Sequence, residues 1–374
     1  MRTLPGFTNA HSHAFQRALR GRVERVDPAH PHDDFWTWRE AMYRAATALD
    51  PDGAYTVARQ LYGEMLAAGY TAVGEFHYPH HQPDGTPYPD PNAMARATVA
   101  AARDAGIEIV LLMCAYARAG AGLPPTPGQR RFCDPDVASY LERVESLAGE
   151  CAVGLAPHSV RAVPREWLEE IARYAERSGM VVHIHAGEQR REVEEALEEY
   201  GRRPIELLAD TGLLGPRTTV VHATHVTGDE LGLLAGSGAT VCACPTTEAN
   251  LGDGFLPAAE LLERGIPVCI GSDSNTIVDP ILELREIEAC ARRLVERRNV
   301  LVPPGADGPS RYLLEIGTVN GARALGLEAP VGEVEIDASH PYLQGVAGPD
   351  LLPALLFGGT AAALTPRPES KGSA

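Results

Sequence analysis

Lysine is almost absent from this sequence. Its 374 residues include 33 lysines and arginines, and the only lysine is Lys371. A P-loop lysine, a Schiff-base lysine and a carbamylated lysine that bridges two metal ions are therefore not expected. Long apolar runs are absent too, because a membrane span needs about 18 consecutive apolar residues, and the best run, residues 107–117, contains Glu108. We therefore expect no membrane span, and we expect that no lysine takes part in the chemistry.

Positive charge is outweighed by negative charge. The chain has 33 Lys and Arg against 50 Asp and Glu, which gives a formal net charge of −17. A field of this sign repels nucleic acids and anionic membrane surfaces, so neither is expected as a partner. Residues 1–10 lack the apolar segment of a secretory signal, and seven cysteines in such a chain are typical of reduced thiols. We expect a cytoplasmic protein.

Short apolar strands alternate with amphipathic helical stretches along most of the chain. Near-continuously apolar strands joined by helices indicate a parallel sheet that is covered on both faces. Eight such strands in succession favour an α/β fold, a closed (β/α)8 TIM barrel. The expected strands are Thr3–Asn9, Thr71–His77, Ile107–Cys114, Cys151–Ala156, Met180–His185, Thr218–His222, Ala239–Cys244 and Pro267–Ser272.

Polar residues gather at the carboxyl ends of these strands. In a barrel such ends meet at one mouth, although the residues lie up to about 260 positions apart. They are His11 and His13 after the first strand, His185 and Glu188 after the fifth, His222 after the sixth and Asp273 after the eighth. Their convergence predicts a functional site at the mouth of the barrel.

The spacing of the histidines suggests a metal site. His11 and His13 lie two residues apart on an extended segment, so both imidazoles point to one side and can bind one ion. His185 offers a third nitrogen and Asp273 an oxygen, which leaves a position open for water, as in catalytic zinc sites. Taken singly, the histidine pair could lie in a turn, and Asp273 could cap a helix. Four such residues at strand ends favour the metal site.

The predicted site holds one ion and two further polar groups. The end of the fourth strand, residues 156–161, has neither lysine nor carboxylate, so a bridged pair of metal ions is not expected. Glu188 is suited to move a proton from an activated water to a leaving nitrogen, although it could instead be a helix N-terminal residue favoured by the dipole. His222 could polarise the water or the substrate. His183, one pleat deeper than His185, is expected to be structural.

Four segments resemble one protein family. They are HSHAFQRA (11–18), EFHY (75–78), HSVRAV (158–163) and GSDSN (271–275). Together with the histidine and aspartate pattern they resemble the mononuclear deaminase branch of the amidohydrolase superfamily, and more narrowly the formimidoylglutamate deiminases. The resemblance implies hydrolysis of N-formimino-L-glutamate to N-formyl-L-glutamate and ammonia, a step of histidine degradation, at one divalent metal ion. Zinc is expected, and Fe2+ or Mn2+ are admissible.

The resemblance also implies the roles of individual residues. The implied metal ligands are His11, His13, His185 and Asp273. The implied catalytic residues are Glu188, His222 and Asp273. The implied substrate contacts are Gln16, Arg39, Tyr78, His158 and Arg161. A small anionic dicarboxylate substrate needs local cations in an acidic protein, and Arg39 and Arg161 offer them. Surface salt bridges are the alternative for both arginines.

The chain departs from the family in three places. Relatives have a small β-rich domain, built partly from a segment before the barrel, but here ten residues precede His11, and the C-terminal strand segment is reduced to 332–336. We therefore expect a barrel over residues 1–325, a short remnant of the small domain over 326–364 and a disordered tail over 365–374. The third departure is Asn275, where relatives are expected to have a histidine that bears on substrate positioning.

Other functions are compatible with the sequence. The same metal site could deaminate a nucleobase or nucleoside-type ring, but such a pocket needs stacking aromatics and few cations, and the aromatic content is 6%. An inactive barrel that binds a metabolite is an alternative of another class, against which the intact ligand set and Glu188 speak. Hydrolysis of an imidazolone ring is less favoured because of the HSVRAV segment. Barrel faces often pair, so a homodimer is compatible with the sequence.

Overall fold

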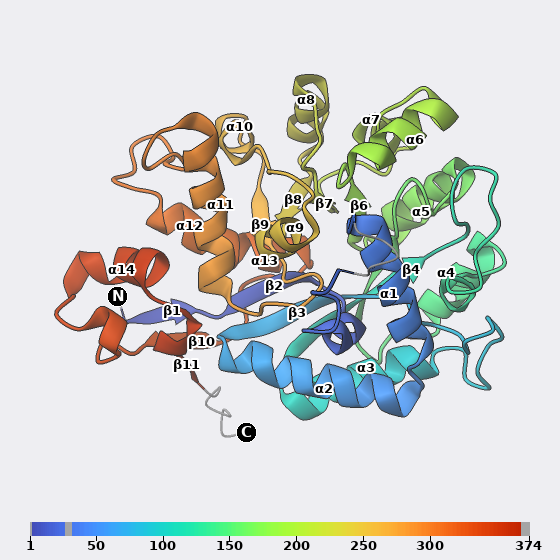
Figure 1. Ribbon diagram of the computed structural model, residues 1–374, viewed down its shortest axis with the longest axis horizontal. Coiled ribbons are helices and arrows are strands. Elements are labelled where there is room, and N and C mark those ends of the chain that lie inside the picture. The colour runs from blue at the N-terminus through green and yellow to red at the C-terminus, as the bar shows by residue number, and fades with distance from the viewer. Residues whose placement is uncertain (1, 27–31, 368–374) are drawn as a thin grey trace.

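The computed structural model describes residues 2–26 and 32–367 (Figure 1). Eight parallel strands follow one another in chain order in one sheet: β2 (Phe7–Ser12), β3 (Tyr70–His77), β4 (Glu108–Ala115), β5 (Ala152–Pro157), β6 (Val182–Ala186), β7 (Thr218–His222), β8 (Thr240–Ala243) and β9 (Val268–Ile270). The two edges meet just beyond β2 and β9. There the N–H of Asp273 donates to the carbonyl of His11, and the N–H of His13 donates to the carbonyl of Asp273, both at 3.0 Å. The predicted (β/α)8 barrel is confirmed.

Helices surround the barrel (Figure 1). They are α3 (Ala93–Ala105), α4 (Val137–Glu145), α5 (Arg165–Ser178), α6 (Arg190–Tyr200), α7 (Pro204–Asp210), α8 (Gly228–Ser237), α9 (Pro245–Leu251), α10 (Ala258–Glu263), α11 (Pro280–Val295), α12 (Ser310–Gly317) and α13 (Val319–Ala324). Two more, α1 (Phe35–Thr47) and α2 (Pro51–Ala67), occupy a stretch with no expected element. Each begins after an aspartate that caps it: Asp34 accepts from the N–H of Thr37, and Asp50 from that of Gly53.

A second, antiparallel sheet joins the two ends of the chain. It contains β1 (Thr3–Pro5), β10 (Glu333–Ile336) and β11 (Leu364–Arg367), with β10 in the middle. The prediction of one barrel strand over residues 3–9 is therefore wrong, because β1 belongs to this sheet and the chain enters the barrel after Gly6. A Cβ on Gly6 would lie 2.2 Å from Oγ1 of Thr71 and 2.3 Å from the carbonyl oxygen of Val331. The backbone passes from one sheet to the other where no side chain fits.

The predicted disordered tail is wrong for its first three residues. Thr365 pairs with Glu335 and Arg367 with Glu333 in β11. Pairing with β10 satisfies backbone groups that this segment cannot satisfy alone, and α14 (Leu351–Gly358) leads the chain back to the small sheet. Residues 368–374 lie outside the described residues. The boundaries of the barrel and of the small-domain remnant stay a proposal.

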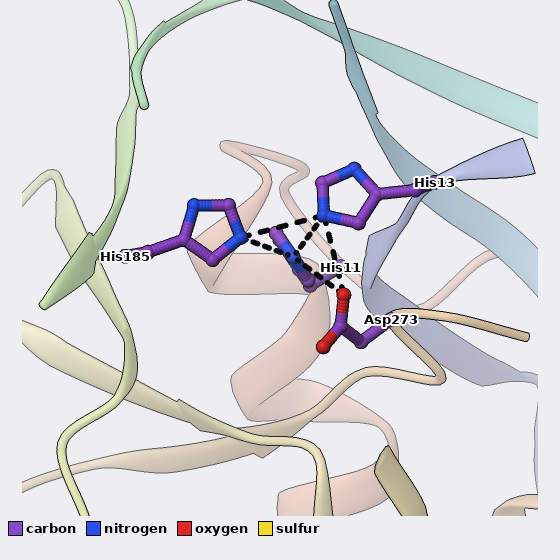
Figure 2. A group of neighbouring side chains, drawn as sticks. All are labelled: His11, His13, His185 and Asp273. Atoms are coloured by element: carbon purple, nitrogen blue, oxygen red, sulfur yellow. Dashed lines mark hydrogen bonds and ion pairs between the residues drawn. The ribbon is translucent and has the colours of Figure 1, made fainter. Parts of the chain in front are cut away.

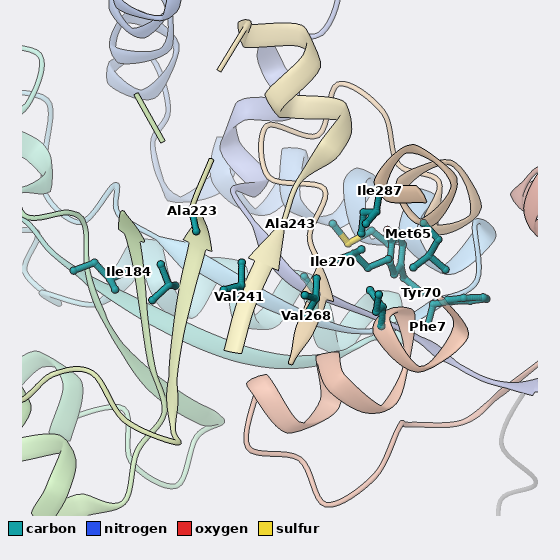
Figure 3. Close-up of a cluster of buried hydrophobic side chains, with 14 of the residues drawn as sticks. Phe7, Met65, Tyr70, Ile184, Ala223, Val241, Ala243, Val268, Ile270 and Ile287 are labelled. Atoms are coloured by element: carbon teal, nitrogen blue, oxygen red, sulfur yellow. The ribbon is translucent and has the colours of Figure 1, made fainter. Parts of the chain in front are cut away.

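Apolar side chains on the outside of the barrel pack against its helices (Figure 3). Val241 of β8 and Val268 and Ile270 of β9 are buried, as are Ile287 of α11 and Met65 of α2. Removing such side chains from water stabilises the fold by roughly 25 cal/mol per Å² of apolar surface. The strands are thereby held in place from outside, while their carboxyl ends are left for polar residues. Within the described ranges, no helix combines the length and the apolarity needed to cross a bilayer.

A buried ion pair holds the segment between β4 and α4. Nε and Nη2 of Arg143 donate to the two carboxylate oxygens of Asp134 at 2.8 and 2.6 Å, and both side chains are buried. Burial raises the pKa of Asp134, but His81 and Arg143 outweigh it and lower that pKa below its usual range. The pair therefore contributes stability at neutral pH that is lost as the pH falls through the depressed pKa.

Asp134→Asn is expected to lower the free energy of unfolding by about 3–5 kcal/mol at pH 7, because it leaves Arg143 buried without a counter-charge. Denaturant unfolding measures the change. The difference from the wild type should shrink below about pH 4. Asp210→Asn is the matched control, because Asp210 pairs with Arg202 at the surface at 2.9 Å, and we expect it to cost less than about 1 kcal/mol. Equal losses in both variants would contradict the role given to the buried pair.

Candidate active site

The four residues predicted as metal ligands point at one another (Figure 2). The Nε2 atom of His11 lies 3.2 Å from that of His13 and 3.1 Å from that of His185, and the last two lie 3.4 Å apart. Oδ1 of Asp273 lies 3.2 Å from Nε2 of His13 and 3.5 Å from Nε2 of His11. All four side chains are buried. Strands β2 and β6 and the segment after β9 thus bring four donor atoms to one point.

These donors fit a tetrahedral cation. Nδ1 of His13 lies 2.9 Å from the carbonyl oxygen of Phe76, and Nδ1 of His185 lies 2.8 Å from that of His158. Each ring therefore donates from Nδ1 and turns the lone pair of Nε2 inward, where it faces other lone pairs. Burial lowers the pKa of His11 to about 3, so the His11 ring is neutral at pH 7. Tetrahedral zinc with Zn–N bonds of about 2.0–2.1 Å holds its donors about 3.3–3.4 Å apart.

The backbone at the ends of β7 and β9 takes an unusual conformation. His222, Ala223, Asp273 and Asn275 have φ values of 74°, 52°, 43° and 59°, in the left-handed region. Each such residue costs of order 1–3 kcal/mol and persists only where its surroundings hold it. Nδ2 of Asn275 donates to the carbonyls of His13 and Asp273, both at 2.9 Å. Asn275 thus braces two ligand-bearing segments and does not line the site cavity.

Glu188 and His222 lie beside the four donors. Nε2 of His222 lies 3.5 Å from Oε1 of Glu188 and 3.7 Å from Oδ2 of Asp273, while its Nδ1 lies 3.3 Å from Oε1 of Glu248. Burial alone would lower the pKa of His222, but the three surrounding carboxylates raise it well above its usual range. Burial raises the pKa of Glu188. The two groups can therefore hold and exchange protons next to the donors.

The residues predicted to contact substrate all line one cavity, which also reaches the donors: Gln16, Arg39, Tyr78, His158 and Arg161. Nε2 of Gln16 donates to the hydroxyl of Tyr78 at 2.9 Å. Nε and Nη1 of Arg39 and of Arg161 are buried and have no hydrogen-bond partner among the described residues. Neither arginine forms an ion pair within that part of the chain, so surface salt bridging does not explain them. Their roles toward substrate stay a prediction.

Two polar residues of the site, Glu248 and Tyr43, were not predicted from the sequence, whereas the structural role of His183 was. Glu248 follows β8 by five residues, and the rule that polar residues gather after barrel strands could have found it. Tyr43 lines the cavity from α1. Because it does not follow a barrel strand, the same rule could not have found it. His183, predicted to be structural, is buried with Nε2 2.9 Å from the carbonyl oxygen of Ala324.

Comparisons with known proteins show the family to which the chain belongs. A profile described as the amidohydrolase family matches residues 2–338, so the chain belongs to that family, as predicted. More particularly, the chain is 41% identical over 371 residues to the formimidoylglutamate deiminase of Pseudomonas aeruginosa, covering 95% of this chain and 81% of that protein.

Two further proteins are similar to this chain, one in sequence and one in sequence and fold. A 5-methylthioadenosine/S-adenosylhomocysteine deaminase of Halobacterium salinarum is 31% identical over 348 residues, with 90% of this chain and 71% of the relative covered. Among solved structures, an amidohydrolase from Brucella melitensis superposes with a TM-score of 0.88 at 37% identity, covering 97% of this chain and 84% of the other.

Proposed function

We propose that His11, His13, His185 and Asp273 bind one divalent metal ion per chain. Three imidazoles and one carboxylate form a donor set that suits zinc, and Fe2+ or Mn2+ are alternatives with the same set. The support is the inward direction of the Nε2 lone pairs and donor separations of 3.1–3.5 Å. When bound, such an ion activates a water molecule as a nucleophile.

We propose that the protein hydrolyses N-formimino-L-glutamate to N-formyl-L-glutamate and ammonia. One observation carries this proposal: the cavity that reaches the donors contains two guanidinium groups, of Arg39 and Arg161, with buried N–H atoms that no described residue accepts. A substrate with two carboxylates supplies acceptors for these donors, and bidentate arginine–carboxylate contacts are among the strongest hydrogen bonds. The 41% identity to a formimidoylglutamate deiminase supports the same substrate.

The catalytic roles follow from the positions of the polar groups. Oε1 of Glu188, 3.5 Å from Nε2 of His222, takes a proton from the attacking water and gives it to the nitrogen that leaves as ammonia. His222, held by Glu248, places a positive charge where negative charge develops on the attacked formimino group. Asp273 contributes one oxygen to the donor set and lies 3.7 Å from His222 through the other. Arg39 and Arg161 hold the carboxylates and so orient the reacting carbon.

A substrate panel tests this function. Ammonia release is measured with N-formimino-L-glutamate, guanine, cytosine and 5′-methylthioadenosine as substrates, on protein of known metal content. We expect kcat/KM for N-formimino-L-glutamate to exceed that for each ring by at least about 10³-fold, because a site built for carboxylates leaves buried donors unpaired with a neutral ring. A preference for a ring would favour the nucleobase or nucleoside deaminase. No turnover of any compound by metal-loaded protein would favour a metabolite-binding barrel.

A further inference from the structure

Three residues outside the predicted site form a hydrogen-bonded group at the wall of the cavity. Nε2 of Gln129 donates to the hydroxyl of Tyr43 at 3.0 Å and to the hydroxyl of Tyr116 at 2.8 Å. The two hydroxyl oxygens lie 3.4 Å apart. All three side chains are buried, and Tyr43 lines the cavity. We propose that Tyr43, oriented by Gln129, donates a hydrogen bond to a carboxylate of the substrate.

The direction of the hydrogen bonds carries the argument. Oε1 of Gln129 accepts the backbone N–H of Thr126 at 2.9 Å, so the amide nitrogen must face the tyrosines. Its two hydrogens go to the two phenol oxygens. Both phenols therefore act as acceptors toward Gln129, and each must direct its own hydrogen elsewhere.

Only one of these two hydroxyl hydrogens can be donated to an acceptor within the group. The contact between the hydroxyls of Tyr43 and Tyr116 can use one of them, and neither hydroxyl has a further acceptor among the described residues. Tyr43 is the member that lines the cavity. With Tyr116 donating to Tyr43, the hydrogen of Tyr43 is left for an acceptor in the cavity, and a buried donor without an acceptor is costly.

The surroundings of Tyr43 define the acceptor as an anion. The guanidinium carbon of Arg39, four residues earlier on α1, lies 5.6 Å from the centroid of the Tyr43 ring. The guanidinium carbon of Arg39 also lies 4.5 Å from the centroid of the Trp36 ring, and the guanidinium carbon of Arg161 lies 5.6 Å from the same centroid. Two cations with unpartnered N–H atoms thus line the same cavity as Tyr43. A carboxylate is the group in the proposed substrate that suits all three donors, so this inference rests on the proposed function.

The loop before α4 holds α1 at the required position. A Cβ on Gly128 would lie 3.1 Å from Cβ of Tyr43, so the missing side chain lets the loop approach and brings Gln129 to the hydroxyl. Nη1 of the buried Arg131 donates to the carbonyls of Ala46 and Leu49, at the C-terminal end of α1. Gln129 and Arg131 are therefore positioning residues for the wall that α1 contributes.

Tyr43→Phe tests the inference through binding and turnover. We expect KM for N-formimino-L-glutamate to rise about 10- to 100-fold, as for loss of a hydrogen bond to a charged group, and kcat to change less than about threefold. Two analogues, with the α- or the γ-carboxylate replaced by a methyl group that cannot accept a hydrogen bond, locate the contact. The penalty of the substitution should disappear with one analogue and persist with the other. Equal penalties for both analogues would overturn the inference.

Calorimetry with glutarate, a plain dicarboxylate, keeps this test separate from the proposed function. A Kd for glutarate that rises tenfold or more in Tyr43→Phe supports the carboxylate contact even where N-formimino-L-glutamate is not turned over. Gln129→Met, which removes both N–H donors, should raise that Kd about three- to tenfold and serves where Tyr43→Phe does not fold. Tyr140→Phe is the matched control, since it removes a buried hydroxyl 2.8 Å from the carbonyl of Met113. An unchanged Kd in both test variants, or an equal rise in the control, would overturn the inference.

Discussion

Glu188→Gln is expected to lower kcat for ammonia release from N-formimino-L-glutamate by about 10²- to 10⁴-fold, the range typical of losing a general acid–base group. Glutamine keeps the shape of the side chain but cannot take a proton from water or return it to the leaving nitrogen. Glu188 is not one of the four converging donors. Its Oε1 lies 3.5 Å from Nε2 of His222, which is not one of them either. Bound metal should therefore stay near one ion per chain, and KM should change little.

Steady-state kinetics and elemental analysis of the same preparation measure both quantities. Glu192→Gln is the matched control, because Glu192 is also buried and its Oε2 accepts the N–H of Glu188 at 3.0 Å, but it does not line the cavity. Burial raises the pKa of Glu192 to about 7, and an amide oxygen can accept the same hydrogen. We expect its kcat within about threefold of the wild type. A Glu188→Gln protein with more than a tenth of the wild-type kcat would contradict the proton-transfer role.

Much of the barrel could be predicted because its strands are buried on both faces. A strand such as β4 (Glu108–Ala115) is apolar along almost its whole length, and this pattern needs no knowledge of distant residues. The small sheet could not be predicted in the same way. Its strands come from both ends of the chain, and β1 is only three residues long. Pairing of Leu4 with Val334 depends on the finished fold and not on local pattern.

The residues of the site also divide into those that could be predicted from the sequence and those that could not. His11, His13, His185 and Asp273 could be predicted to meet because each comes at or just after the carboxyl end of a barrel strand, and topology alone brings those ends together. Tyr43 and Gln129 could not be predicted, since they lie on a helix and a loop whose positions depend on packing of α1 at the mouth. The role of Asn275 also needed coordinates. Its contact with the carbonyl of His13 joins residues 262 positions apart.

His185→Ala is expected to remove the metal and, with it, the activity. Nε2 of His185 lies 3.1 and 3.4 Å from those of His11 and His13, so its loss would leave only two nitrogens and one oxygen to hold an ion. Removing even an outer partner of a ligand costs about 10- to 100-fold in affinity, and loss of a direct ligand should cost more. After dialysis against a chelator and return of one equivalent of zinc, we expect less than about a tenth of an ion per chain.

Thermal unfolding with and without zinc shows whether the folded protein binds the ion. Zinc at 100 times its Kd should stabilise the wild type by about 2.7 kcal/mol and leave His185→Ala unchanged. His183→Asn is the control on the same strand, because His183 lies two residues earlier and its Nε2 contacts the carbonyl of Ala324 at 2.9 Å. It should lose some stability but keep near one ion. Equal metal loss in both variants would mean that packing within the barrel, and not the four converging donors, decides whether the ion binds.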